Sequence, residues 1–175
     1  MLPNVLKTET IYWGRTFSLR LDDVEYAPGH STRMEIVEHT GAVVMAPLDS
    51  ERNVWFVRQY RHATGGSLLE LPAGTLGRDE DPALGAAREL QEEIGMRAGK
   101  LERLLSFWLA PGYSTEFMHV FLATELSPSQ LTPDEDENIT IEKVPWQQAL
   151  AMAQNGEIRD AKSLASLFAV ARRLG

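Results

Sequence analysis

The sequence of 175 residues contains no cysteine. This absence excludes disulfide bonds, thiolate nucleophiles, cysteine-bound zinc and iron–sulfur clusters. No run of apolar residues approaches the ~20 that a membrane-spanning helix requires. Polar and charged residues follow the first four residues, and the apolar stretch of a signal peptide is missing. These absences predict a soluble, cytoplasmic protein that does not act at a membrane.

Basic residues are also scarce, with 17 Lys and Arg against 25 Asp and Glu and a net charge of −8. Binding to DNA, RNA or an anionic membrane needs clustered positive charge, so the composition argues against these partners. A small anionic substrate is still compatible, because a bound divalent cation reverses the local sign of a site. Hydrophobic residues make up 43% and charged residues 24%, as is usual for a globular domain.

The periodicity of apolar residues predicts strands first and helices later in the chain. The 68–71 strand is expected to end before Pro72, because the segment 72–74 must leave extended structure. A polar loop is expected at 127–138. Strands are expected at 8–13, 16–21, 33–38, 41–48, 53–60, 68–71, 101–109, 116–125 and 139–144, and later helices at 146–154 and 161–174.

A further helix is expected after Asp81, which is a suitable N-cap residue, with Pro82 at the first helical position. Gly95 is placed to end this helix. An apolar stripe at steps of four, three and four predicts its buried side, formed by Ala83, Ala87, Leu90 and Ile94.

The same helix carries three glutamates, Glu89, Glu92 and Glu93, at spacings that place them on one side. Three like charges repel one another unless a cation lies among them, and clustered carboxylates suit Mg²⁺ or Mn²⁺ better than zinc. The preceding loop, Gly74 to Gly77, has two glycines that allow its backbone to approach closely. The alternative interpretation is a solvated acidic helix face.

The full spacing around these glutamates is more informative than the glutamates alone. It matches at every position the Nudix box, Gly-x5-Glu-x7-Arg-Glu-U-x-Glu-Glu-x-Gly-U, in which U is bulky and apolar. The matching residues are Gly74, Glu80, Arg88, Glu89, Leu90, Glu92, Glu93, Gly95 and Met96. The chain therefore resembles the Nudix hydrolases over nearly its whole length. The resemblance implies an α+β protein, an α/β/α sandwich with a mixed β-sheet, the box loop-helix and an N-terminal antiparallel strand region.

The resemblance also implies the chemistry. Nudix enzymes hydrolyse a nucleoside diphosphate linked to another group, using divalent metals and a metal-activated water that attacks one phosphorus. Glu89 and Glu93 match the principal metal-ligand positions, and Glu92 is an additional ligand or a catalytic residue that holds the water. The backbone carbonyl of Ala73 matches a further metal contact. Arg88 and Glu80 are expected to brace the loop against the helix.

Three further features resemble the ADP-ribose pyrophosphatase subfamily. Pro111 lies sixteen residues after Gly95, and the stretches 57–61 and 69–74 are also similar to that group. The implied reaction is the Mg²⁺-dependent hydrolysis of ADP-ribose, or a related nucleoside diphosphate sugar, to AMP and ribose 5-phosphate. Alternatives are a Nudix hydrolase of GDP-mannose or a dinucleotide, and an ADP-ribose-sensing domain without catalysis. Pro111 is otherwise a simple turn-former between two strands.

The subfamily resemblance also suggests substrate contacts. Arg61 is expected to bind substrate, because a guanidinium suits phosphate. Arg58 is the weaker candidate, because the alternation of a strand places only one of several nearby side chains in the site. Glu70 and Glu116 are expected at the rim of the substrate site. Phe17, in preference to Trp13, is a candidate to stack on adenine, although core packing explains Phe17 slightly better.

An acidic run at 134–137 lies in the predicted loop before the last strand. Pyrophosphatases that the chain resembles place a mobile loop with the catalytic base there, which makes water activation depend on loop closure. Glu135 is the favoured base, and Glu137 is the second candidate or an added metal ligand. An ordinary solvated loop is the alternative.

One Nudix domain is expected over residues 1–175, with a strand region at 1–38 and a catalytic core at 39–175. The strands expected between residues 8 and 21 carry more apolar surface than an exposed hairpin can leave in water. Together with the resemblance, this predicts a homodimer in which the N-terminal strands pack against the partner and help to shape the adenine pocket.

Overall fold

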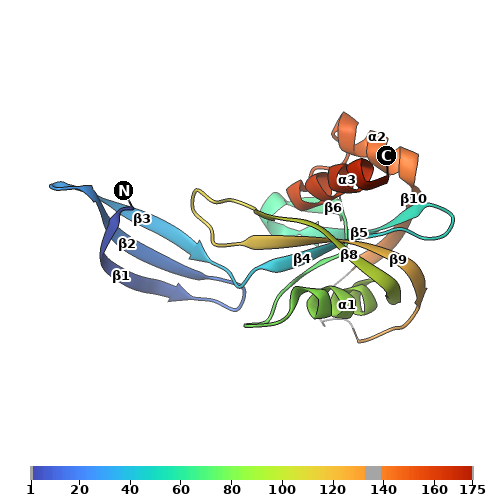
Figure 1. The fold of residues 1–175 in the computed structure, drawn as a ribbon, viewed down its shortest axis with the longest axis horizontal. Coiled ribbons are helices and arrows are strands. Elements are labelled where there is room, and N and C mark those ends of the chain that lie inside the picture. The colour runs from blue at the N-terminus through green and yellow to red at the C-terminus, as the bar shows by residue number, and fades with distance from the viewer. Residues whose placement is uncertain (1, 133–138, 175) are drawn as a thin grey trace. The chain divides into compact units, whose positions relative to one another are not determined.

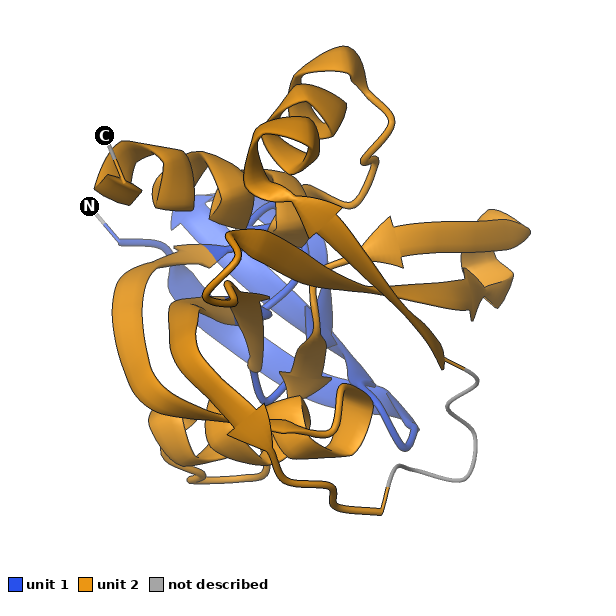
Figure 2. Ribbon diagram, turned by 90° about the vertical axis from the view of Figure 1, so that its right-hand side faces the viewer, with its two compact units in different colours: residues 1–41, 108–117 blue, residues 42–107, 118–175 orange. Residues whose placement is uncertain are grey.

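The computed structural model describes residues 2–132 and 139–174. Contacts between residues divide the chain into two compact units (Figure 2). The first comprises Met1–Gly41 with Trp108–Phe117, and the second comprises Ala42–Phe107 with Met118–Gly175.

The first unit is built on a three-stranded antiparallel sheet in the order β1-β2-β3. Its strands are β1 (Asn4–Trp13), β2 (Ser18–Ala27) and β3 (His30–Glu38). All three predicted strands are present, and each is longer than predicted. Gly29 has a φ of +79° in the turn between β2 and β3, a conformation that glycine adopts without strain. Within this unit, the segment Trp108–Phe117 pairs with the end of β3 through a bridge between Val37 and Ser114.

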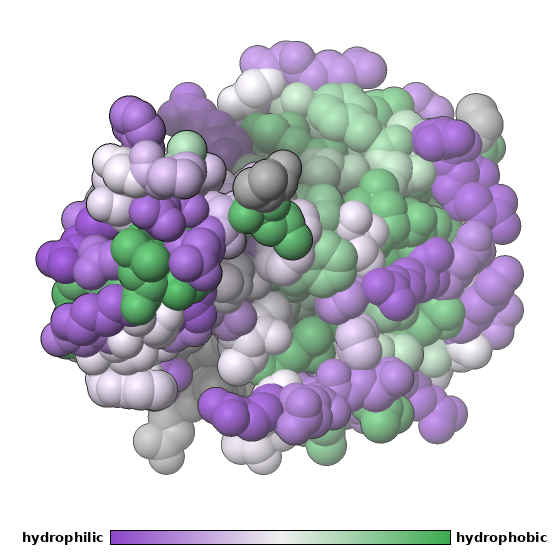
Figure 3. Space-filling view, turned by 60° about the vertical axis from the view of Figure 1, so that its left-hand side comes forward, coloured by the Kyte–Doolittle hydropathy of each residue, from purple (hydrophilic) through white to green (hydrophobic). Residues whose placement is uncertain are grey.

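Strand β1 leaves several large apolar side chains in solvent. Trp13 is 77% exposed, and the others are more than half exposed: Val5, Leu6, Ile11 and Tyr12. Figure 3 shows green apolar side chains at the surface between purple polar ones, in a view that brings the left-hand side of Figure 1 forward. A small sheet with this much apolar surface in water is only marginally stable without a covering partner.

The second unit contains two sheets, one in the order β7-β4-β9-β8 and one in the order β10-β5-β6. The first sheet is mixed, because β4 pairs with β9 in parallel and with β7 in antiparallel orientation. A short 3₁₀ helix, His62–Thr64, joins β5 to β6. The strands are β4 (Ala42–Pro47), β5 (Asn53–Arg61), β6 (Gly66–Glu70), β7 (Ala73–Thr75), β8 (Met96–Trp108), β9 (Phe117–Pro128) and β10 (Ile139–Pro145).

Three helices complete the second unit: α1 (Pro82–Glu93), α2 (Trp146–Asn155) and α3 (Ala161–Leu174). Helices α1 and α3 both contact β4, and in Figure 1 they lie on opposite sides of it. This arrangement confirms the predicted α+β class and sandwich. No helix among residues 2–132 and 139–174 is long and apolar enough to cross a membrane.

The caps of α1 follow the prediction. The Asp81 side chain accepts hydrogen bonds from the N–H groups of Ala83 and Leu84, at 2.8 and 3.3 Å. Pro82 is the first helical residue, and Gly95 follows the helix with a φ of +65°. These features fix where the box helix starts and ends, and therefore which side of it each glutamate occupies.

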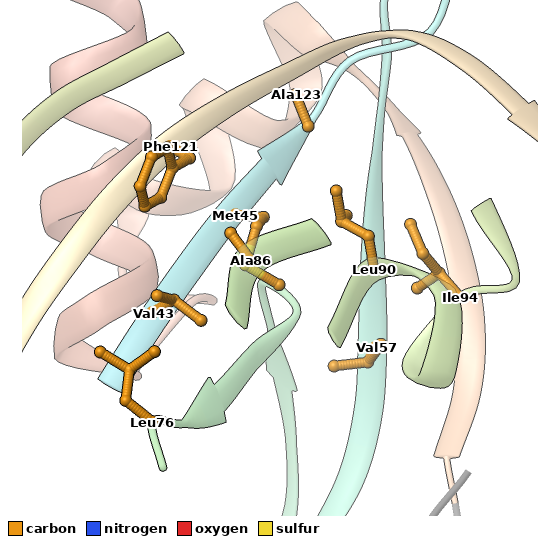
Figure 4. Packing of buried hydrophobic residues seen from close by; sticks show 9 residues of the cluster. All are labelled: Val43, Met45, Val57, Leu76, Ala86, Leu90, Ile94, Phe121 and Ala123. Atoms are coloured by element: carbon orange, nitrogen blue, oxygen red, sulfur yellow. The ribbon is translucent and has the colours of Figure 1, made fainter. Parts of the chain in front are cut away.

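A hydrophobic core lies between α1 and the sheets (Figure 4). Helix α1 contributes Ala86, Leu90 and Ile94, and the remaining members are Val43, Met45, Val57, Leu76, Phe121 and Ala123. The predicted stripe holds at Leu90 and Ile94 but was wrong in the first turns of the helix: Ala83 is exposed, Ala87 is only half-buried, and Ala86 is the buried alanine of the cluster. An alanine-rich first turn gives too little contrast in hydrophobicity to fix the register of the stripe.

A second prediction was wrong: residues 72–74 were expected to leave extended structure, but Ala73 and Gly74 belong to strand β7. This strand pairs with β4, and the N–H of Met45 donates to the carbonyl of Pro72 at 2.9 Å. Buried backbone groups require hydrogen-bond partners, and strand pairing supplies them here. The pairing holds the box loop beside the start of β4.

Candidate active site

The box loop is tied to α1 through Arg88. Its Nε and Nη2 each donate to the Glu80 carboxylate at 3.2 Å, and Nη2 also reaches the carbonyl of Thr75 at 3.4 Å. Glu80 in turn accepts from the N–H of Gly77 at 2.7 Å. The hydrogen bonds from Arg88 have the largest effect and lower the pKa of Glu80, and the hydrogen bond from Gly77 lowers it further. The expected bracing of the loop by Arg88 and Glu80 is thereby confirmed.

Glu89 and Glu93 are buried, each only 7% exposed. An Oε atom of Glu93 accepts from the N–H of Ala73 at 3.0 Å. The Glu89 carboxylate lies against Gly74 so closely that a Cβ atom there would overlap it. Both carboxylates therefore converge on the backbone of β7. Buried carboxylates are costly unless cations or hydrogen bonds compensate them, so a solvated acidic face does not describe this side of the helix.

Arg88 also contacts the glutamates. Its Nη1 donates to Glu89 and to Glu92 at 2.7 Å each, so one guanidinium connects three carboxylates. Burial alone would lower the pKa of Arg88, but its interactions with Glu80, Glu89 and Glu92 outweigh burial and raise it. Glu92 is less buried than Glu89 and Glu93. Its position is compatible with contact to a water molecule or a ligand.

The donor atoms of this cluster suit a hard divalent cation, since they are carboxylate and backbone oxygens. Within the described ranges, no group of three acidic or histidine side chains is arranged to hold a metal ion. A cation bound beside Glu89 and Glu93 would therefore need further oxygen ligands, which water and substrate can supply. The other acidic candidates, Glu135 and Glu137, lie outside the described residues.

Arg61 and Glu70 form a bidentate ion pair near the glutamates of the box helix. Arg61 donates from Nε and Nη2 to the two Glu70 oxygens, at 2.8 and 2.7 Å. Arg61 lies four residues after Val57 on β5, so both point to the sheet face on which Val57 packs with α1. The hydrogen bonds with Glu70 raise the pKa of Arg61, and the negative charge of Glu93 acts in the same direction.

Glu70, which the resemblance predicts at the rim of the site, is only 1% exposed. Its second cation is Lys162 of α3, whose Nζ lies 2.5 Å from a Glu70 oxygen. Burial alone would raise the pKa of Glu70, but Arg61 and Lys162 outweigh burial and lower it to about 2. The carboxylate is therefore ionised at neutral pH and fully engaged by protein cations.

Arg58 lies three residues from Arg61 on the same strand, so its side chain points to the opposite face of the sheet. It donates to Glu142 of β10 from Nε and Nη2, at 2.5 and 3.2 Å. The structure thus brings Arg61, and not Arg58, to the face that carries the box.

Phe17 and Glu116 belong to the first unit. The Phe17 ring is partly exposed and lies 5.8 Å from the ring of Tyr12. Glu116 is half-buried, and its N–H donates to the Ser114 hydroxyl at 3.1 Å. Pro111 lies in an exposed turn that is closed by a hydrogen bond from Tyr113 to the carbonyl of Ala110.

Sequence reasoning missed Lys162 and its neighbour Asp160. Lys162 lies 92 residues from Glu70 along the chain, and no spacing rule connects the two. The only local signal is Asp160 before α3, where its side chain accepts from the N–H of Ser163 at 3.0 Å. That signal marks a helix start and says nothing about a site.

Comparison with known families matches the NUDIX domain to residues 38–167. Together with the complete box and the loop–helix geometry, this match shows that the chain belongs to the Nudix family and is a Nudix hydrolase.

Individual relatives are similar over most of their length. A methanol dehydrogenase activator of Bacillus methanolicus is 37% identical over 161 residues, covering 91% of this chain and 87% of that protein. An ADP-ribose pyrophosphatase of Bacillus subtilis (strain 168) is 38% identical over 157 residues, covering 89% of this chain and 85% of that protein. The crystal structure of an ADP compounds hydrolase superposes with a TM-score of 0.88 at 26% identity, covering 99% of this chain and 95% of that one.

Proposed function

We propose that this protein hydrolyses the pyrophosphate bond of ADP-ribose, or a related nucleoside diphosphate sugar, with Mg²⁺ or Mn²⁺ as the cofactor. The proposal depends mainly on two buried carboxylates, Glu89 and Glu93, which converge on the backbone of residues 73–74. Arg61 lies on the same side of the sheet. A site of this kind combines oxygen ligands for a cation with a guanidinium for phosphate. Similarity to an ADP-ribose pyrophosphatase over 89% of the chain supports the substrate class.

In this proposal Glu89 and Glu93 hold the metal, together with the carbonyl of Ala73. When bound, the cation lowers the pKa of a water molecule and neutralises phosphate oxygens. Glu92 helps to hold the water, and Arg88 keeps the three glutamates in position through its contacts with Glu80 and the box loop.

The protein groups also handle the substrate and the proton. Arg61 binds a phosphate oxygen, and Glu70 orients Arg61 through two hydrogen bonds. Glu135 is the proposed base that takes the proton from the attacking water, with Glu137 as the alternative. Hydrolysis adds one water across the P–O–P bond, so ADP-ribose yields AMP and ribose 5-phosphate.

A substrate panel tests the proposal. Purified protein is incubated with ADP-ribose, GDP-mannose and a dinucleotide, in Mg²⁺, in Mn²⁺ and with chelator. We expect ADP-ribose or a related sugar nucleotide to be cleaved in metal and not with chelator. Turnover of the dinucleotide alone would contradict the substrate class, and binding of ADP-ribose without turnover in either metal would indicate a sensing domain.

We also propose that the working form is a homodimer, in which the sheet of the first unit packs against the partner. The support is the apolar surface of β1, including Trp13 and Ile11. Phe17 is proposed to stack on the adenine of the substrate, and Glu116 to lie at the rim of the site.

A further inference from the structure

The carboxylate of Glu70 is shared by two cations from distant parts of the chain. Arg61 at the end of β5 binds both of its oxygens, and Lys162 in the first turn of α3 binds one of them at 2.5 Å. Lys162 is only 14% exposed, so this ion pair is shielded from solvent. Shielded charges interact more strongly than surface charges, and each partner affects the others.

Lys162 is itself held in place. Its Nζ lies 2.9 Å from Asp160, whose carboxylate also accepts from the N–H and hydroxyl of Ser163. The Ser163 hydroxyl in turn accepts from the N–H of Leu71, the residue after Glu70, at 2.7 Å. Two connections therefore join the start of α3 to residues 70–71, one through charge and one through a backbone hydrogen bond.

The network contains two negative charges, on Glu70 and Asp160, and two positive charges, on Arg61 and Lys162, so its net charge is zero. Arg61 directs Nε and Nη2 to Glu70, and no protein group among the described residues bonds its Nη1. Its side chain is 39% exposed, so part of it is open to solvent and to a ligand. Without Lys162, Glu70 alone would neutralise Arg61, and the attraction of the guanidinium for an anion would fall.

We infer that Lys162 is a positioning residue for substrate binding: it fixes the Glu70 carboxylate and offsets its charge, so that Arg61 presents an oriented, positive Nη1 to a substrate phosphate. This inference rests on the function proposed above and adds a residue from α3 to it. The Lys162 ammonium contacts two protein carboxylates, those of Glu70 and Asp160. It therefore acts on the substrate through Glu70 and Arg61 and not by direct contact.

The test compares Lys162→Met, Lys162→Arg and the control Lys100→Met. Lys100 is an exposed lysine with a 3.8 Å contact to Glu102, so the control removes a charge of the same type away from the network. With ADP-ribose and Mg²⁺, we expect Lys162→Met to raise KM about tenfold and change kcat less than about threefold, as loss of one shielded charge partner predicts. Lys162→Arg should restore KM, and the control should leave it unchanged.

A merely structural lysine would lower the melting temperature and leave KM unchanged, because KM is measured on folded molecules. An unchanged KM in Lys162→Met would therefore overturn the inference while the proposed function stands. Absence of turnover in the unmodified protein would contradict the proposed function instead.

In either case the exchange rate of the Arg61 Nε–H, measured by NMR and assigned with Arg61→Lys, tests the positioning directly. We expect faster exchange in Lys162→Met than in the unmodified protein and the control. An equal rate in all three would overturn the inference.

Discussion

At the scale of single residues, Glu93 is a principal metal ligand in the proposed mechanism. Replacing it by glutamine keeps its size and an oxygen that can accept from the N–H of Ala73. We expect Glu93→Gln to fold normally and to lose at least ~10³-fold in kcat, since a lost anionic ligand removes several kcal/mol of charge stabilisation. Steady-state kinetics beside a thermal melt measure this. Near-normal turnover would refute the assignment of Glu93 as a principal ligand.

Glu70 gives a prediction about stability and pH. Its pKa is about 2 in the folded protein against an ordinary value of 4.5. A carboxylate with a lowered folded pKa adds stability above its unfolded pKa, and this stability disappears as the pH falls toward the folded pKa.

We therefore expect Glu70→Gln to lower the free energy of unfolding at neutral pH by about 3 kcal/mol, because Arg61 and Lys162 lose their buried partner. The difference between the two proteins should shrink as the pH falls from 4.5 toward 2. Urea unfolding over a pH series measures it, with Glu142→Gln at an exposed pair as the control. A difference that does not change with pH would contradict the account.

At the scale of elements, the close packing of β7 against α1 defines the site. A Cβ at Gly74 would overlap the Glu89 carboxylate, whereas at Gly77 the nearest atom is the end of the Glu80 side chain at 3.4 Å. We expect Gly74→Ala to displace Glu89, lowering kcat and destabilising the fold by about 1–3 kcal/mol, while Gly77→Ala has a much smaller effect. Kinetics and urea unfolding of both variants test this. Equal effects would show that the contact does not control the site.

The elements also show what sequence can and cannot predict. Helix α1 was predicted with its caps because Asp81, Pro82 and Gly95 act locally. Strand β7 was missed because its stability comes from pairing with β4, which no local pattern encodes. The Nudix box led directly to Glu89 and Glu93 because their spacing is short and fixed.

The Glu70 network could not be predicted in the same way, because it joins β5 and β6 to Lys162 of α3, which lies 92 residues from Glu70 along the chain. Alternation along β5 places Arg61 and Arg58 on opposite faces of the sheet, but the sequence does not say which face packs against α1. The tertiary structure shows that this is the face of Val57 and Arg61, so Arg61 is the arginine beside the box.

At the scale of the whole molecule, the apolar surface of β1 predicts assembly. Ile11 and Trp13 are both large apolar side chains at the end of β1, 52% and 77% exposed. We expect the unmodified protein to sediment as a dimer at micromolar concentration and the double variant Ile11→Glu, Trp13→Glu to sediment as a monomer. Phe168→Glu, at a partly exposed position on α3, is the control and should remain dimeric. A monomeric unmodified protein would refute the proposed dimer.

The central claim is that this Nudix protein is a metal-dependent pyrophosphatase of ADP-ribose or a closely related sugar nucleotide. The most direct measurement is the identification of products by ³¹P NMR after incubation with ADP-ribose and Mg²⁺, beside a sample with chelator and one with Glu93→Gln. The account predicts AMP and ribose 5-phosphate in equal amounts from the unmodified protein with Mg²⁺, and little product from the other two samples. Intact ADP-ribose in all three samples, or equal cleavage with chelator, would contradict it.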